Sequence, residues 1–298
     1  MDGIIIKGVG GLYTIKTEKG FIECKARGIF RKNKMTPTIG DFVVVENDSI
    51  SEIKPRKNIL IRPTVANIDK LFIVVAVANP SPDHFYIDKL TVIADYYNIE
   101  PILIFNKLDL EKTAKIAEIY EKLSYKRYFL HAENEKCSFS EDAINLASEL
   151  KGCTAALAGL SGVGKSTILN VLAEIDGSNE IKAEVGEISN RLQRGKHTTR
   201  HVELFSLCGG YIADTPGFGS LEFEYFDIKD RKELQYNFIE FKEYIGNCKF
   251  SDCIHLKDKG CCIREAVDAG QICPERYDSY CRMYEGLGEY KHWEDNKN

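Results

Sequence analysis

The chain has 298 residues, of which 44% are hydrophobic and 29% are charged, as in an ordinary soluble globular protein of two or three domains. No run approaches the roughly 18 apolar residues that a membrane helix needs. The N-terminus has no basic region followed by an apolar stretch, so we expect no secretory signal, no membrane partner and a cytoplasmic location.

The first 62 residues predict a small basic β-barrel, for which an OB-fold is a good candidate. Short strands at 3–6, 11–15, 21–26 and 41–45 are separated by Gly-rich or charged turns, a spacing typical of such barrels. This region carries 12 Lys and Arg against 7 Asp and Glu, whereas the whole chain has a net charge of −5. The basic segment 27–34 around Phe30 indicates a nucleic-acid partner, because bases stack on rings while Lys and Arg neutralise phosphates. A merely solvated basic surface and an exposed hairpin are the alternatives.

From Ile68 onward, strands and helices alternate. The predicted strands are 70–77, 101–105, 128–130 and 154–158, the predicted helices are 84–97, 111–124 and 140–150, and 202–207 with 210–214 could form a hairpin. Alternation of this kind predicts a doubly wound α/β domain that binds ligands at the carboxyl ends of its strands. After about residue 221 the strands stop, and we expect short helices.

A phosphate-binding loop is predicted between strand 154–158 and the next helix. It matches G-x-x-x-x-G-K-S and comprises Gly159, Leu160, Ser161, Gly162, Val163, Gly164, Lys165 and Ser166, followed by Thr167. Glycines let the backbone N–H groups turn toward a β-phosphate, Lys165 reaches the β/γ oxygens as a catalytic side chain, and Ser166 is a ligand for Mg²⁺. A chance match in a Gly-rich loop is the alternative, and the strand–loop–helix context argues against it.

A D-x-x-G switch is predicted directly after the apolar segment 210–214. In Asp214-Thr215-Pro216-Gly217, the carboxylate of Asp214 would hold Mg²⁺ through water and the N–H of Gly217 would sense a γ-phosphate. A purely structural turn has a similar sequence, so this interpretation depends on the phosphate loop upstream.

A guanine-reading element is predicted where strand 101–105 ends. Asn106, Lys107, Leu108 and Asp109 match N-K-x-D. The Asp109 carboxylate can accept two N–H bonds from guanine, whereas adenine would leave it unpaired. A second base-contacting loop is expected at His131-Ala132, although the Ser of the usual Ser-Ala turn is absent.

The order of these motifs is rotated relative to that of familiar small GTPases. N-K-x-D precedes the phosphate loop by about 50 residues instead of following D-x-x-G. The spatial order of strands can survive such a rotation where the old termini lay close together. The rotation also places the C-terminal segment directly after D-x-x-G.

A metal site is predicted near the C-terminus. Cys248, Cys253, His255 and Cys261 form C-x4-C-x-H-x5-C, a ligand set that suits one tetrahedral structural zinc ion. Clustered cysteines in a cytoplasmic protein indicate metal rather than disulfides. Rival ligands are Cys262, Cys273 and Cys281, and buried free thiols are the alternative.

Taken together, the barrel, the rotated GTPase motifs and the Cys/His segment resemble the ribosome small-subunit-dependent GTPase family, RsgA/YjeQ. The resemblance covers essentially the whole chain. It implies an N-terminal OB-fold that binds ribosomal RNA, here 16S rRNA, and a GTPase that acts late in 30S subunit maturation with hydrolysis stimulated by the subunit.

The segment Arg194-Gly195-Lys196-His197-Thr198-Thr199-Arg200 falls where switch I belongs. We expect Thr199 to complete the Mg²⁺ shell. Phe218 follows D-x-x-G where many GTPases place a water-orienting Gln, and the family resemblance makes His197 the leading candidate for that role. The alternative is that His197 only orders its loop or contacts RNA.

The sequence therefore predicts an OB-fold domain at 1–64, a circularly permuted P-loop GTPase domain at 65–220 and a mainly α, zinc-binding domain at 221–298. We expect a monomeric GTP hydrolase that binds GTP and GDP with Mg²⁺. An RNA- or protein-binding module with a purely structural nucleotide is disfavoured by the intact Lys165, Ser166 and Asp214. A P-loop kinase or ATPase is disfavoured by Asp109.

Overall fold

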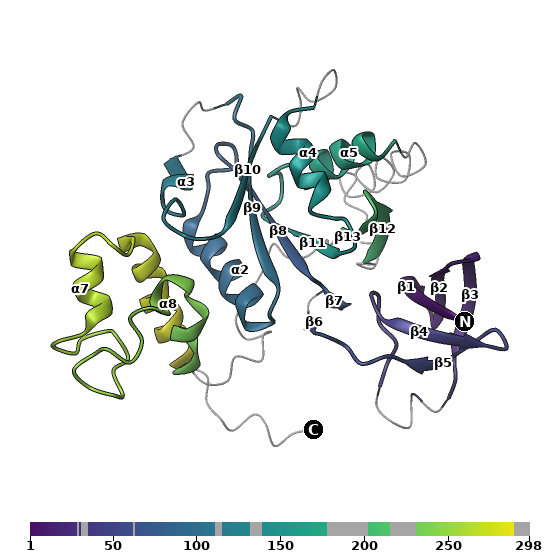
Figure 1. The fold of residues 1–298 in the computed structure, drawn as a ribbon, viewed down its shortest axis with the longest axis horizontal. Coiled ribbons are helices and arrows are strands. Elements are labelled where there is room, and N and C mark those ends of the chain that lie inside the picture. Colours follow the sequence, from purple (N-terminus) through teal and green to yellow (C-terminus); the bar gives the residue numbers. More distant parts are fainter. Residues whose placement is uncertain are drawn as a thin grey trace.

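The computed structural model describes residues 1–28, 30, 35–61, 63–110, 115–131, 139–177, 202–214 and 231–288. Figure 1 shows three parts: an N-terminal barrel in purple, a central sheet flanked by helices, and a C-terminal helical part in yellow-green beside α2. We call this last part the C-terminal helical region, residues 231–288. No helix in these described ranges is both long and apolar enough to cross a membrane.

Within the described part of the chain, five strands close the N-terminal barrel in the order β1-β2-β3-β5-β4. The strands are β1 (Asp2–Val9), β2 (Leu12–Thr17), β3 (Gly20–Ala26), β4 (Phe42–Glu46) and β5 (Ser49–Ile53). β3 pairs with β5 in parallel and the other pairs are antiparallel, which is the predicted OB arrangement. Ile5, Ile15, Val43 and Ile50 are fully buried inside it. The sequence patterning had not predicted β5, which begins after Asn47 and Asp48, two residues with positive φ that turn the chain.

A hairpin joins the barrel to the central domain. It consists of β6 (Ile59–Ile61) and β7 (Thr64–Ala66). The N–H of Ala66 donates to the carbonyl of Ile39 at 2.8 Å, and the side-chain amide of Asn67 donates to the carbonyl of Gly40 at 2.8 Å. Gly40 has φ of +87°, and a Cβ there would lie 2.1 Å from the carbonyl oxygen of Ala66. Only glycine therefore permits this close contact between barrel and hairpin.

Over the described residues, the central sheet has six strands in the order β10-β9-β8-β11-β13-β12. They are β8 (Lys70–Ala76), β9 (Glu100–Asn106), β10 (Lys126–Leu130), β11 (Thr154–Ala158), β12 (Glu203–Leu207) and β13 (Gly210–Asp214). All neighbours are parallel except β12, which forms the predicted hairpin with β13. This is the predicted doubly wound α/β domain.

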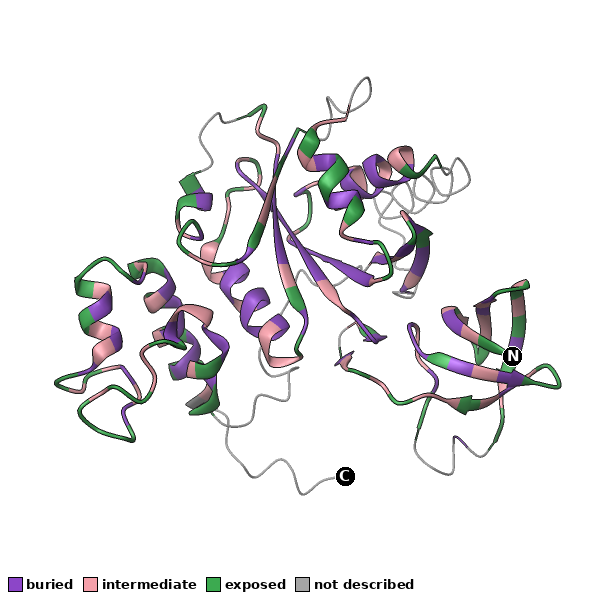
Figure 2. Ribbon diagram, in the orientation of Figure 1, coloured by how far each residue is buried: buried purple, intermediate pink, exposed green. Residues whose placement is uncertain are grey.

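Helices cover both faces of the sheet because its strands are buried on both sides. Along β8, Leu71, Ile73 and Val75 share a core with α2 (His84–Tyr96), whereas Phe72 and Val74 share one with the helices of the other face. Those helices are α4 (Glu141–Ser148) and α5 (Lys165–Asp176). Figure 2 shows the strands between these layers as largely buried.

The helix predicted at 111–124 is wrong in extent. Residues 111–114 lie outside the described residues, and α3 spans only Lys115–Glu118. After it the chain makes tight turns, in which the N–H of Tyr120 donates to the carbonyl of Ala117 and that of Leu123 to Tyr120. These bonds span three residues instead of four, which winds the chain more tightly than an α-helix, and Tyr120 is fully buried.

The C-terminal helical region packs against α2. It contains η2 (Glu233–Asn237), η3 (Ile239–Phe241), α7 (Cys262–Asp268) and α8 (Pro274–Gly288). Phe238, Phe241 and Tyr280 form a fully buried aromatic cluster with ring centroids 5.0–5.4 Å apart. These side chains belong to the same hydrophobic core as α2, so the region and the sheet domain are joined by apolar contact.

Candidate functional site

The predicted phosphate loop lies between the fully buried strand β11 and the N-terminus of α5. Gly159 has φ of +146°, and a Cβ there would lie 2.4 Å from the carbonyl oxygen of Val74. Gly164 caps α5 with φ of +103°, and its Cβ would lie 2.1 Å from the side-chain nitrogen of Asn106. Both glycines are therefore required by backbone conformation and by close neighbours. Helix N–H groups that point into the loop make it an anion site.

Lys165 and Asp214 are the charged groups of this loop region. The ammonium of Lys165 donates to the carbonyls of Gly159 and Leu160, both at 2.9 Å, and so lies over the loop. Burial lowers the pKa of Lys165, while the Asp214 carboxylate acts to raise it. Burial raises the pKa of Asp214, while Lys165 acts to lower it. A half-buried cation at the phosphate loop and a half-buried carboxylate at the end of β13 suit a triphosphate with Mg²⁺.

The predicted guanine-reading loop meets the phosphate loop. Asn106 ends β9, is 2% exposed, and donates from Nδ2 to the carbonyl of Val163 at 2.9 Å. Lys107 has φ of +66°, and its ammonium donates to the carbonyl of Asn79. Asp109 is exposed at the same strand end. The two loops therefore lie at one edge of the sheet, the arrangement needed to hold a base and its phosphates together.

The remaining residues of the predicted nucleotide site are only partly described. Their exposure varies along the two loops. The half-buried residues are Leu108, Leu160, Ser166 and Thr167, the buried one is Val163, and the exposed ones are Ser161 and Gly162. His131, at the predicted second base loop, is exposed after β10. His197, Thr199, Gly217 and Ala132 lie outside the described residues.

The predicted metal ligands come together. The ligand atoms of Cys248, Cys253, His255 and Cys261 all lie within 4.8 Å of one another. Nδ1 of His255 is 3.5 Å from Sγ of Cys248 and 3.4 Å from Sγ of Cys261. Burial lowers the pKa of His255, which favours the neutral imidazole that binds metal. Three thiols and one imidazole in this arrangement fit a closed tetrahedral zinc site.

Gln235 supports this cluster and was missed by the sequence analysis. Its Oε1 lies 2.7 Å from Nε2 of His255, so it holds the ring with Nδ1 toward the thiols. Gln235 lies 13 positions before the first cysteine of the motif and belongs to no recognisable pattern. No sequence signal marked it.

The rival cysteines are placed differently. Sγ of Cys262 is 3.1 Å from Sγ of Cys248, but it also lies 3.0 Å from the carbonyl of Tyr244, to which it donates. Cys273 donates to Glu275 at 2.9 Å instead. Among the described residues, Cys262 thus places a fourth sulfur beside a cluster of three thiols and one imidazole.

Comparison with known proteins covers almost the whole chain. Residues 53–224 match the family model for the RsgA GTPase, and residues 2–52 match that for the RsgA N-terminal domain. The chain is 41% identical over 293 residues to the small ribosomal subunit biogenesis GTPase RsgA of Clostridium beijerinckii, covering 97% of this chain and 98% of the relative. It is 39% identical to the protein of the same name from Bacillus anthracis, with 97% and 98% covered.

Two solved structures have the same fold. YloQ, described as a circularly permuted GTPase, superposes with a TM-score of 0.76 at 34% identity, covering 97% of this chain and 96% of YloQ. YjeQ from Thermotoga maritima superposes with a TM-score of 0.80 at 32% identity, covering 97% and 99%. Both likenesses extend through barrel, sheet and C-terminal helical region.

Proposed function

This chain belongs to the RsgA family of circularly permuted GTPases and is a GTP-hydrolysing enzyme, and we propose that its hydrolysis serves late maturation of the small (30S) ribosomal subunit. The names of its relatives support this role. The observation that carries the nucleotide assignment is the bond between Asn106 and Val163, because it joins the guanine-reading loop to the phosphate loop. Work on the 30S subunit also makes the bacterial cytoplasm the proposed location.

We propose the following roles for the nucleotide site. Asp109 accepts the N–H groups of guanine, and Lys165 and the amides of residues 159–167 hold the phosphates. Family membership implies Mg²⁺ with GTP, and the ion would neutralise charge on the β- and γ-oxygens. Ser166 would hold it directly and Asp214 through water. Thr199 and Gly217 would complete the γ-phosphate contacts.

We propose that hydrolysis is slow in the free enzyme and is stimulated by the subunit. Phe218 stands after D-x-x-G, and a phenyl ring cannot orient water. His197 in the switch I segment would orient the attacking water once contact with the subunit places it. GDP and phosphate would be the products, and hydrolysis would release the enzyme from the subunit.

The barrel is the proposed contact with 16S rRNA. Residues 1–62 have a net positive charge although the whole chain is negative, and the electrostatic attraction of phosphates favours binding through this end. The ammonium of Lys16 lies 4.3 Å from the ring centroid of the exposed Phe21. An aromatic ring and a cation are thus presented together, as is typical of surfaces that bind single-stranded nucleic acid.

The C-terminal helical region would hold one structural zinc ion in the cluster Cys248, Cys253, His255 and Cys261. The domain limits 1–64, 65–220 and 221–298 stay proposals, as does a monomeric state. The limit between 220 and 221 falls in the stretch 215–230, which lies outside the described residues.

Hydrolysis measured with and without added 30S subunits tests the proposed function. We expect GTP turnover to rise strongly with 30S subunits and to remain low with 50S subunits. ATP should not compete for the site. Equal turnover in the presence and absence of 30S subunits would overturn the proposal while leaving the GTPase activity itself intact.

A further inference from the structure

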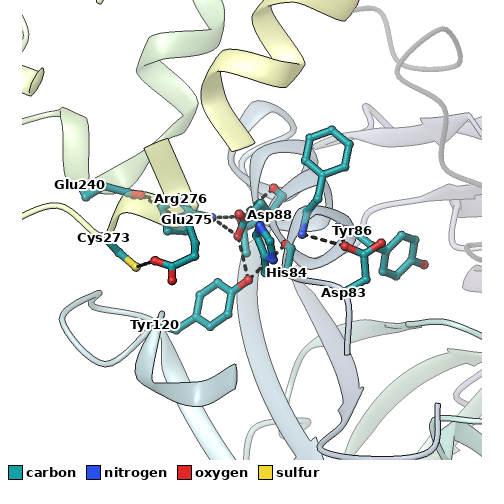
Figure 3. A network of polar contacts seen from close by, with 11 residues as sticks. Asp83, His84, Tyr86, Asp88, Tyr120, Glu240, Cys273, Glu275 and Arg276 are labelled. Atoms are coloured by element: carbon teal, nitrogen blue, oxygen red, sulfur yellow. Dashed lines mark hydrogen bonds and ion pairs between the residues drawn. The ribbon is translucent and has the colours of Figure 1, made fainter. Parts of the chain in front are cut away.

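Arg276 forms a buried ionic contact between the C-terminal helical region and α2 (Figure 3). Its side chain is 0% exposed. Nε and Nη2 donate to the two carboxylate oxygens of Glu240 at 2.7 and 3.0 Å, and Nη1 donates to Oδ1 of Asp88 at 2.7 Å. Glu240 belongs to the same region as Arg276, whereas Asp88 belongs to α2. The guanidinium therefore fixes one region to the other.

Neighbouring side chains leave this contact little freedom. Nη1 of Arg276 also donates to Oγ1 of Thr91 at 3.1 Å, and the hydroxyl of Tyr120 donates to Oδ1 of Asp88 at 2.8 Å. Burial raises the pKa of Tyr120, so its hydroxyl stays protonated as the donor. A guanidinium cannot be neutralised, and loss of one partner in a buried network leaves an uncompensated charge. The network thus favours a single arrangement of α2 against the C-terminal helical region.

The same helix turn holds the phosphate loop. Tyr86 lies two positions before Asp88 and points away from it (Figure 3), as expected for residues two apart on a helix. Tyr86 lines a small apolar hollow together with Leu160 and Val163 of the phosphate loop. Burial raises the pKa of Tyr86, while the backbone of Gly159 acts to lower it. Asp83 caps this turn by accepting from the N–H of Tyr86 at 3.3 Å. One turn of α2 thus contacts the phosphate loop on one side and Arg276 on the other.

A second connection runs to the guanine-reading loop. The ring of Tyr120, which donates to Asp88, packs against Phe105 with centroids 6.5 Å apart. Phe105 directly precedes Asn106 in β9. The buried ionic network is therefore linked to both nucleotide loops. It reaches the phosphate loop through Tyr86 of α2, and it reaches the guanine-reading loop through Tyr120 and Phe105.

We infer that Arg276 is a positioning residue for the nucleotide pocket: by seating on Asp88 it fixes α2, and α2 fixes the phosphate loop through Tyr86. The docking of the C-terminal helical region thereby sets nucleotide affinity. The inference rests on the GTPase activity and requires no ribosomal partner. Coupling of this kind is reciprocal, so bound nucleotide must also tighten the docking.

Arg276→Gln in the full chain tests the inference, with Lys242→Ala as the matched control. Lys242 pairs with Asp95 at 3.0 Å, which is another contact between the C-terminal helical region and α2, but an exposed one. The readouts are the Kd of a fluorescent GDP analogue, kcat and KM without ribosomal subunits, and the zinc content. Hydrogen exchange of α8 is followed with and without GDP.

For Arg276→Gln with its zinc retained, we expect the Kd for GDP to rise by about 5- to 150-fold, the usual range of coupling between sites. GDP should also slow exchange in α8 of the parent protein but not in this variant. Lys242→Ala should match the parent in every readout. A folded Arg276→Gln protein with unchanged Kd and KM would overturn the inference, and so would an equal effect of Lys242→Ala.

If Arg276→Gln does not fold, a double-mutant cycle between Asp88→Asn and Tyr86→Phe decides the matter. Both changes keep the shape of the side chain. Effects on the Kd for GDP that depart from additivity by at least about twofold support coupling through α2. Additive effects, or no effect of Tyr86→Phe, would overturn it. Because no assay contains ribosomal subunits, these outcomes are independent of the proposed function.

Discussion

The side-chain amide of Asn106 donates to the main-chain carbonyl of Val163 at 2.9 Å across 57 positions of the chain. β9, which ends at Asn106, and β11, which leads to Val163, are separated in the sheet by β8. The bond therefore spans the carboxyl ends of three adjacent strands. It joins in space the proposed guanine-reading loop and the phosphate loop, which lie far apart in the sequence.

Replacing Asn106 with Ala should weaken nucleotide binding. The carbonyl of Val163 would lose its buried donor, at a cost of roughly 1–3 kcal/mol, and the phosphate loop would lose its link to β9. We expect the Kd for GDP to rise about tenfold or more, measured by titration of a fluorescent analogue. An unchanged Kd in a variant with parental thermal stability would contradict this account.

Replacing Asp109 with Asn should change which base is preferred. Each charged hydrogen bond from guanine contributes roughly 1.5–3 kcal/mol, so affinity for GDP should fall at least about tenfold. An amide offers an N–H group where xanthine carries a carbonyl in place of the guanine amino group, so xanthosine diphosphate should bind better than before. Competition titrations with the two diphosphates measure both effects. If the variant still prefers GDP by the parental ratio, Asp109 does not read the base.

The nucleotide loops could be predicted from sequence because each is a short continuous motif. At Gly159 and Gly164 the positive φ that favours glycine belongs to the loop itself, and the spacing to Lys165 is fixed by the chain. The buried network could not be predicted, because Arg276 and Asp88 lie 188 positions apart and neither belongs to a motif. Charged residues are usually exposed, so their pattern gives no sign of burial.

The fold shows the same division between local and distant information. Continuous apolar strands such as β8 were predicted because burial on both faces leaves a visible run. The helix expected at 111–124 was wrong in extent, since the tight turns around Tyr120 accompany a distant hydrogen bond to Asp88. β5 was missed because it contributes few apolar side chains and is defined by pairing with β3 and β4.

Glu149 should make folding stability depend on pH in acid. Burial alone would raise its pKa, but hydrogen bonds from Lys70, Lys126 and Tyr128 lower it from 4.5 to about 2. A carboxylate whose pKa is lower in the folded than in the unfolded protein stabilises the fold fully at pH values above its unfolded-state pKa. This stabilisation is lost as the pH falls from about 4.5 toward 2. The full contribution is at most about 3 kcal/mol.

Comparison with Glu149→Gln isolates that contribution. The difference in unfolding free energy between parent and variant should be constant above about pH 6 and should shrink by roughly 1 kcal/mol near pH 3.5. Urea titrations at several pH values measure it, and taking the difference removes effects of other acidic groups and of metal. A difference that stays constant down to about pH 3.5 would show that Glu149 has no depressed pKa.

Replacing His197 with Ala should abolish most of the stimulation that we propose for 30S subunits. A positioned water-orienting or general-base group contributes typically about 10²–10⁴-fold, so subunit-stimulated turnover should fall within that range while GTP affinity stays parental. Stimulated hydrolysis and nucleotide titration are measured on the same preparation. Parental stimulated turnover with normal GTP affinity would remove His197 from the mechanism and leave it an ordering or RNA-contacting role.

The neighbouring thiols Cys261 and Cys262 should differ in their effect on zinc. Sγ of Cys261 belongs to the four-ligand cluster, whereas Sγ of Cys262 lies 3.0 Å from the carbonyl of Tyr244. A structural zinc site supplies much of the folding free energy of a small region. Cys261→Ala should therefore lose its metal and melt at a lower temperature, while Cys262→Ala should retain about one equivalent of zinc.

Metal analysis and thermal melting of both proteins provide the test, in which each variant is the control for the other. Loss of zinc from Cys262→Ala with retention by Cys261→Ala would exchange the two assignments, and parental zinc content in both would remove Cys261 from the ligand set.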